Sequence, residues 1–180
     1  MKRTFFTGTV LMVILFFVAA GCDVSVNPLV FDGSPISTRI EIDTEQNTFE
    51  YSNSINLNAA VVDFDDVVDS ISVYNVTLKV ENRLSPSAET PFNAYLYIDD
   101  VKLADINGLT FAAFESEQSL FTDELLEYIT INLNSVESLS TKLAQSPLPT
   151  VNVKVAGNVE EGPLTFDLLV TLYTQVYTTP

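Results

Sequence analysis

Four carboxylates fall within seven residues of this chain, at Asp63, Asp65, Asp66 and Asp69. Ca²⁺ takes about 6 to 8 oxygen ligands, so an acidic cluster of this kind can bind it. The spacing lacks the central glycine and the twelfth-position glutamate of an EF-hand loop. Asp99, Asp100 and Asp105 would join the cluster only if the fold brings them close. The sequence therefore leaves two readings, a calcium site and a solvated acidic segment.

A second candidate for chemistry is the only cysteine, Cys22. The chain opens with two cations, Lys2 and Arg3, and then runs without a charge through the apolar residues 10–20 to Gly21 and Cys22. A helix that crosses a membrane needs about 20 apolar residues, so the shorter run fits the core of a signal peptide over residues 1–21. The small residues before Cys22 suit an extended segment that enters a peptidase.

Residues 18–22, Val-Ala-Ala-Gly-Cys, resemble the lipobox of bacterial lipoproteins. The resemblance implies a diacylglycerol thioether on Cys22, cleavage between Gly21 and Cys22, and an acylated first residue. A plain secretory signal and an uncleaved anchor are the alternatives. Two or more acyl chains hold a protein stably at a membrane, so the lipid would supply the attachment. Asp23 resembles an inner-membrane retention signal of enterobacterial lipoproteins, a rule that does not hold in all bacteria, so the choice of membrane stays open.

Composition excludes several kinds of chemistry. The chain has no His and one Cys, so it offers no histidine-based catalytic relay, no intramolecular disulfide, and no imidazole or four-thiolate zinc site. With 8 Lys and Arg against 24 Asp and Glu, it lacks the cationic patches that bind nucleic acid. Cleavage would remove Lys2, Arg3 and no acid, which takes the formal charge from -16 to -18. We therefore expect the mature body to stand off anionic lipid headgroups.

The carboxylates and the aromatic residues could also form an enzymatic site or a binding surface. Glycoside hydrolysis uses a pair of carboxylates, but among 24 acids some pair lies close in any fold, so the pattern gives no sign of an enzyme. Tyr95 and Tyr97 alternate with apolar neighbours, which places both rings on one face of a strand. That face would be either a surface for protein or glycan contact or a second buried face.

The elements that must position these residues are expected to be strands. Residues 22–35 hold two prolines, one glycine and no regular period, which predicts the lipidated cysteine and a short tether. Period-two alternation then predicts one β domain over residues 36–180. A change of parity near Tyr74 indicates a bulge or a break. Strands are expected at 36–42, 49–57, 71–80, 92–98, 101–106, 109–114, 151–155 and 166–172.

Turn and capping signals complete the pattern. Asp99 and Asp100 fit the turn of a hairpin between residues 92–98 and 101–106. A Gly- and Pro-containing loop at 157–163 predicts a second hairpin at the end of the chain. A capping-box pattern predicts a helix over about 135–145, while residues 121–129 fit a helix or a strand.

Many short strands with little helix predict an all-β fold, a two-sheet Ig-like sandwich with one or two short helices after a cleaved signal helix, with a barrel as the alternative. The order of the strands, the helix near 135–145 and the long C-terminal hairpin are similar to the sandwich domains of late-embryogenesis-abundant type 2 proteins over roughly residues 36–177. That resemblance implies a sandwich and no particular ligand or activity.

The expected function is that of a non-enzymatic, lipid-anchored protein of the bacterial cell envelope with a binding or structural role. Its partners would be a membrane, through the lipid, and an envelope protein or glycan; no nucleic acid is expected. Two alternatives differ in what they need. A carrier of a lipid or other apolar ligand needs a cavity of about 300 Å³ or more. A calcium-stabilised module needs the acidic cluster as a metal site.

Overall fold

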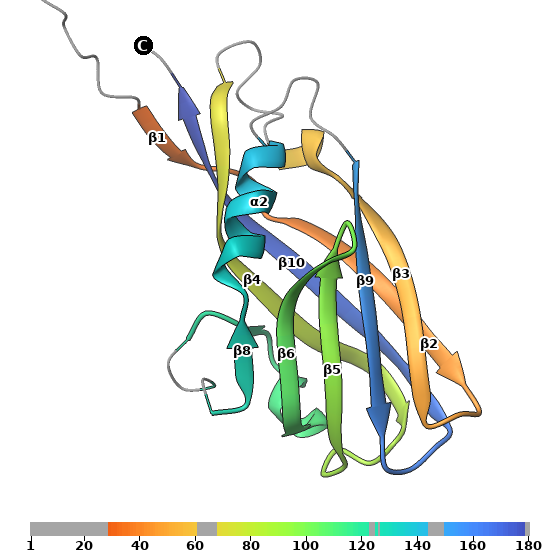
Figure 1. Cartoon of the computed structure of the whole chain (residues 1–180). Helices are drawn as coiled ribbons and strands as arrows, with labels where there is room; N and C mark the ends of the chain where they lie inside the picture. The colour runs from red at the N-terminus through yellow and green to blue at the C-terminus, as the bar shows by residue number, and fades with distance from the viewer. Residues whose placement is uncertain (1–28, 61–67, 123–124, 126, 144–149, 179–180) are drawn as a thin grey trace, which may run out of the picture.

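The computed structural model describes residues 29–60, 68–122, 125, 127–143 and 150–178, which form two five-stranded antiparallel sheets packed face to face (Figure 1). The first, the β10 sheet, contains β1 (Leu29–Asp32), β2 (Ile36–Thr44), β4 (Val68–Ser85), β7 (Gln118–Ser119) and β10 (Leu164–Thr178). The second, the β9 sheet, contains β3 (Thr48–Asn56), β5 (Pro91–Ile98), β6 (Val101–Thr110), β8 (Ile129–Ile131) and β9 (Thr150–Val159). The helices of the described residues are η1 (Leu57–Ala60), η2 (Phe111–Phe114) and α2 (Leu133–Leu143). The expected all-β sandwich is confirmed.

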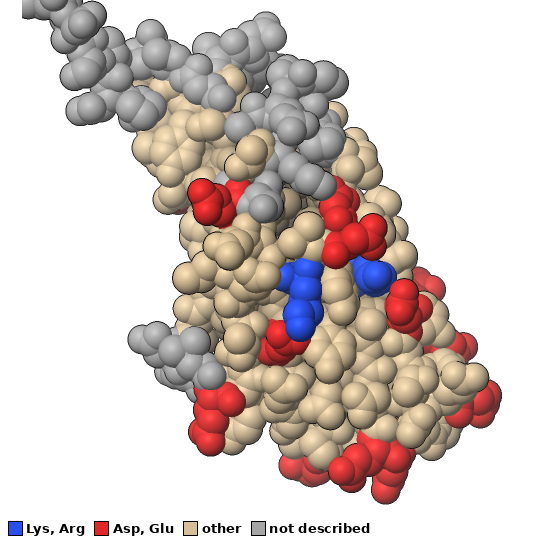
Figure 2. Space-filling model, in the orientation of Figure 1, with Lys and Arg blue, Asp and Glu red and all other residues tan. Residues whose placement is uncertain are grey.

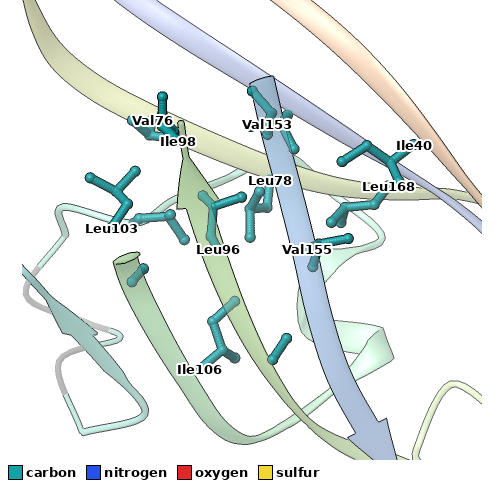
Figure 3. Packing of buried hydrophobic residues seen from close by; sticks show 14 of the residues in the cluster. Ile40, Val76, Leu78, Leu96, Ile98, Leu103, Ile106, Val153, Val155 and Leu168 are labelled. Atoms are coloured by element: carbon teal, nitrogen blue, oxygen red, sulfur yellow. The ribbon is translucent and has the colours of Figure 1, made fainter. Parts of the chain in front are cut away.

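The core follows from the period-two alternation, because alternate side chains of a strand point to opposite faces of the sheet. In β10, alternate residues from Leu164 to Thr178 are buried against the other sheet. Figure 3 shows Leu78 and Leu168 of the β10 sheet meeting Leu96 and Val155 of the β9 sheet. Each such side chain contributes about 1.5–3 kcal/mol when it is fully buried. This apolar layer holds the sheets together and leaves their outer faces to polar side chains.

Three local predictions are confirmed. The pairing of β4 with β10 runs from Asn75 directly to Val73, so Tyr74 is the extra residue of a bulge, where the parity of the sequence changes. Asp99 and Asp100 have φ angles of 48° and 65° and form the turn between β5 and β6. Positive φ at both central residues is the requirement of a type I′ turn, which Asp tolerates better than most residues. The helix expected near 135–145 is α2.

Three other expectations differ from the structure. The prediction of a terminal hairpin is wrong, because β9 pairs with β3 and β5 whereas β10 pairs with β1, β2 and β4. The loop between β9 and β10 therefore carries the chain from one sheet to the other. The strand expected at 109–114 ends at Thr110, and residues 111–114 form η2 with both phenylalanine rings buried. Residues 29–32, which the sequence places in the tether, extend the sheet as β1 alongside the end of β10.

Within the described residues, no helix is long and apolar enough to cross a membrane.

Candidate binding face

The outer face of the β9 sheet carries the two tyrosines that the sequence singled out. Both come from β5, where they alternate with the buried residues Ala94, Leu96 and Ile98. Tyr95 is 37% exposed and Tyr97 is half-buried. Of the two readings of these rings, the structure therefore supports a solvent-facing surface and not a second buried layer. Figure 2 looks onto this face.

Lys102 of β6 is held over the first ring. Its Nζ lies 5.2 Å from the centroid of the Tyr95 ring and 2.8 Å from Oδ1 of Asp105. The hydrogen bond to Asp105 raises the pKa of Lys102 above its ordinary value, and burial opposes this only in part. An ammonium group over an aromatic face is attracted by the ring quadrupole. The ring and the carboxylate together fix the position of the lysine.

Lys154 of β9 makes the matching contact with the second ring. Its Nζ lies 4.7 Å from the centroid of Tyr97, 3.5 Å from Oδ1 of Asp100 and 3.7 Å from Oε1 of Glu50. In the register of the sheet, Lys154 and Lys102 stand on either side of Tyr97. We call Tyr95, Tyr97, Lys102, Lys154 and Asp105 the Tyr95 face.

The charge of this surface differs from that of the whole chain. Figure 2 shows lysines over the middle of the β5, β6 and β9 strands, with carboxylates around them. Two lysines stand against Asp105, Asp100 and Glu50, so the Tyr95 face is close to neutral, while the full chain has a formal charge of -16. Tyrosine rings already held by neighbours lose little further side-chain entropy on binding. The arrangement therefore suits recognition.

Comparison with known proteins identifies no family for this chain. No family model matches the sequence, and no curated protein matches it. Among solved structures, Desmodium yellow mottle tymovirus matches at 9% identity with a TM-score of 0.34, over 85% of this chain and 83% of that chain. Turnip yellow mosaic virus matches at 11% identity and 0.35, over 85% and 96%, and the BFDV capsid protein at 9% and 0.37, over 83% and 98%. Scores this low carry no argument about function or assembly.

The residues of the predicted calcium cluster fall mostly outside the described part of the chain. Asp63, Asp65 and Asp66 lie outside it, as do Gly21 and Cys22 of the lipobox, and Asp69 is part of strand β4. No group of three or more acids among the described residues could hold a metal ion. The calcium site therefore stays a prediction.

The three acids that could have joined the cluster have other partners. Oδ1 of Asp99 accepts a hydrogen bond from the backbone N–H of Asn152 at 2.7 Å. Asp105 pairs with Lys102, and Asp100 lies near Lys154. Asp99 and Asp100 in the turn thus contact β9, and Asp105 pairs within the hairpin of β5 and β6.

The interior between the two sheets contains a small apolar cavity. Its volume is about 10 Å³, and it is lined by side chains of both sheets, among them Phe49, Phe92 and Phe166. A cavity of this size has room for about one water-sized sphere. The aromatic rings fill the space, with the Phe92 and Phe111 centroids 4.5 Å apart. A lipid carrier would need at least about 300 Å³, so this cavity does not support that alternative.

Lys102 and Lys154 are the residues of the Tyr95 face that sequence reasoning missed. The contact of one could have been found, since the predicted Asp99-Asp100 turn places Lys102 opposite Tyr97 and on the same face as Tyr95, the ring that it contacts. The contact of the other could not, because Lys154 reaches β5 through a pairing between strands more than fifty residues apart. No local signal in the sequence specifies that pairing.

Proposed function

We propose that this chain is a non-enzymatic, lipid-anchored protein of the bacterial cell envelope that binds a partner protein through the Tyr95 face. The anchor rests on the lipobox resemblance of residues 18–22. The binding role rests on one observation, the pair of tyrosine rings each held under a lysine on the outer face of the β9 sheet. Tyrosine is enriched at protein interfaces, where its large ring buries area at low entropic cost.

The geometry favours a protein over a glycan as the partner. A sugar stacks on an open ring face, and on each ring one side is already occupied by a lysine ammonium group. A protein surface can instead use the ring edges, the phenol hydroxyls and the paired charges around them. The near-neutral Tyr95 face also avoids the repulsion that the rest of this acidic chain exerts on acidic partners.

The binding role is tested by photocrosslinking in the native envelope. When benzoylphenylalanine replaces Tyr95, illumination is expected to give a discrete band of crosslinked protein. The same replacement at Tyr74, which is 47% exposed on the other sheet, is expected to give none. Lys154→Gln should weaken the Tyr95 crosslink. Lys79→Gln removes the same charge from the β10 sheet and should leave the yield of the Tyr95 crosslink unchanged. Equal crosslinking from Tyr95 and Tyr74, or a glycan adduct at Tyr95, would contradict a protein-binding face.

The anchor is tested separately with Cys22→Ser. Wild-type protein labelled with palmitate in the cell is expected to carry the label and to sediment with membranes. The variant should lose the label and accumulate as an unprocessed precursor, because no thiol is present to be acylated. Labelling of the Cys22→Ser variant would refute the lipoprotein assignment.

A further inference from the structure

The first described strand, β1, exposes apolar side chains on both of its faces. Leu29 and Val30 are each 49% exposed, and Phe31, the next residue, is 43% exposed. Successive residues of a strand point to opposite sides, so Leu29 and Val30 face different directions. Consecutive exposed apolar residues are unusual on a protein surface unless something covers them.

The position of β1 indicates what covers it. β1 pairs with the last residues of β10, from Gln175 to Thr178, and β2 pairs with the first, from Leu164 to Leu172. β10 spans about 50 Å at about 3.3 Å per residue, so β1 lies at one end of the sandwich (Figure 1). Across from Val30 lies Tyr177, which is half-buried. Tyrosine beside aliphatic residues is typical of the boundary between lipid and water.

The length of chain before β1 keeps this end close to the anchor. Six residues separate Cys22 from Leu29. Fully extended, the seven steps between the two Cα atoms span at most about 25 Å. If the lipid on Cys22 lies in a bilayer, Leu29 lies at most about 25 Å from it, so the segment is short enough for β1 to meet the headgroup region.

The carboxylates near the loops lie toward the other end of the sandwich. Glu45 in the turn between β2 and β3, and Glu160 and Glu161 in the loop between β9 and β10, are exposed. Figure 2 shows acidic side chains gathered at that end of the visible face. Electrostatic repulsion is screened within about 8 Å at physiological salt, so the carboxylates at the loop end do not oppose contact at β1, and the exposed Asp32 at the inner end of β1 is the nearby charge that does. This modifies the expectation that acidity keeps the whole body away from the bilayer.

We propose that β1 seats the sandwich on the bilayer that holds the lipid of Cys22, with Leu29 and Val30 entering the interface between headgroups and acyl chains. The inference rests on the proposed lipid anchor. The body then stands upright on its β1 end, and the Tyr95 face points sideways, along the membrane plane.

Single tryptophans test this seating, since the chain contains no Trp of its own. Leu29→Trp and Val30→Trp report from β1. Leu84→Trp is the matched control, because Leu84 is 84% exposed and lies where β4 pairs with the start of β10, at the far end of the sandwich. The full gene is expressed in a bacterial host, and the purified protein is reconstituted into phosphatidylcholine vesicles with and without brominated acyl chains. Mass spectrometry first establishes whether Cys22 carries acyl chains.

In acylated protein, the emission of Leu29→Trp and Val30→Trp is expected to shift to the blue and to be lost in brominated vesicles, while that of Leu84→Trp stays unquenched. Acylated protein in which the β1 tryptophans are unquenched would overturn the seating and leave the anchor intact. A blue shift without quenching, together with a dimeric mass, would assign β1 to a second copy of the chain and also overturn it. Absence of acyl mass would refute the proposed function, and the seating with it.

Discussion

At the scale of single residues, the hydroxyl of Thr174 is a buried polar group without a hydrogen-bond partner among the described residues. Thr174 is 0% exposed, and its Oγ1 has no hydrogen-bond partner among the described residues. A buried hydroxyl without a partner costs about 1–3 kcal/mol, while valine has nearly the same shape and no polar atom. We expect Thr174→Val to raise the free energy of unfolding by about 1 kcal/mol, measured by urea denaturation.

Thr171 on the same strand provides the control. Its Oγ1 lies 2.9 Å from Oγ of Ser37 on β2, so Thr171→Val breaks a hydrogen bond and should lower the free energy of unfolding by up to about 1 kcal/mol. Both substitutions replace a threonine hydroxyl by a methyl group, one at a site without a hydrogen-bond partner and one at a site with a partner. A loss of stability in Thr174→Val equal to that in Thr171→Val would show that the Thr174 hydroxyl has a partner.

Glu117 gives the stability of the fold a dependence on pH. Hydrogen bonds from the Thr77 hydroxyl and from the Tyr173 hydroxyl, the second at 2.8 Å, lower the pKa of Glu117 from its ordinary value of 4.5, and partial burial opposes them. A lowered folded-state pKa adds stability that is complete above pH 4.5 and is lost as the pH falls through the folded-state value.

Glu117→Gln tests this contribution. The variant should be less stable than the wild type at pH 7, by less than about 1 kcal/mol because Glu117 is largely exposed and screened by solvent. The difference should shrink as the pH falls from 4.5 through the lowered folded-state pKa, since the unfolded chain binds the proton first and the folded carboxylate then becomes neutral as well. Urea denaturation at several pH values measures it, and a difference that does not change with pH would contradict this account.

At the scale of elements, Gly157 determines how closely three strands approach one another. It lies in β9 opposite Phe49 of β3 and Ala94 of β5. A Cβ atom at this position would lie 2.4 Å from the backbone oxygen of Asn93 and 2.7 Å from Cζ of Phe49. The ring could turn away, but the carbonyl oxygen could move only together with β5.

We expect Gly157→Ala to lower the free energy of unfolding by about 3 kcal/mol, at the upper end of the range for overpacked cores. The control is Gly108→Ala, where a new Cβ atom meets nothing within 4 Å and only the φ of +69° is unfavourable. That strain costs about 1 kcal/mol. Thermal denaturation of both variants compares the two effects, and equal losses would mean that the β9 sheet adapts to the added methyl group.

The same strands show how far the sequence predicts the elements. Local signals predicted the bulge at Tyr74, the Asp99-Asp100 turn and the region of α2, because each depends on residues that are near in sequence. They also placed Tyr95 and Tyr97 on one face. They gave the wrong partner for β9, because a short Gly- and Pro-containing loop looks the same whether it joins neighbouring strands or crosses between sheets. That choice depends on pairing with β3 and β5, far away in the chain.

At the scale of the whole molecule, the last two strands of the chain occupy the middle of the two sheets. β9 lies between β3 and β5, and β10 lies between β4 on one side and β1 and β2 on the other. Strands β2 and β3 therefore have no neighbour in their sheets, and β4 has only the two-residue β7, until β9 and β10 are in place, whereas β5, β6 and β8 pair earlier. Folds dominated by such non-local pairs form slowly, because loop closure must precede the stabilising contacts.

Deletion of residues 164–180 should therefore abolish folding and not merely remove an edge. Without β10, the apolar side chains of β2 and β4 lose their central partner, and the buried face of the β9 sheet loses the layer that covers it. We expect circular dichroism of the truncated chain to show no cooperative thermal transition. A chain that lacks only residues 179 and 180 serves as the control and should melt like the wild type, since Thr178 is the last residue of β10. A cooperative transition in the chain truncated at residue 163 would mean that the β9 sheet is stable alone, and β10 would then be a late addition to a preformed half.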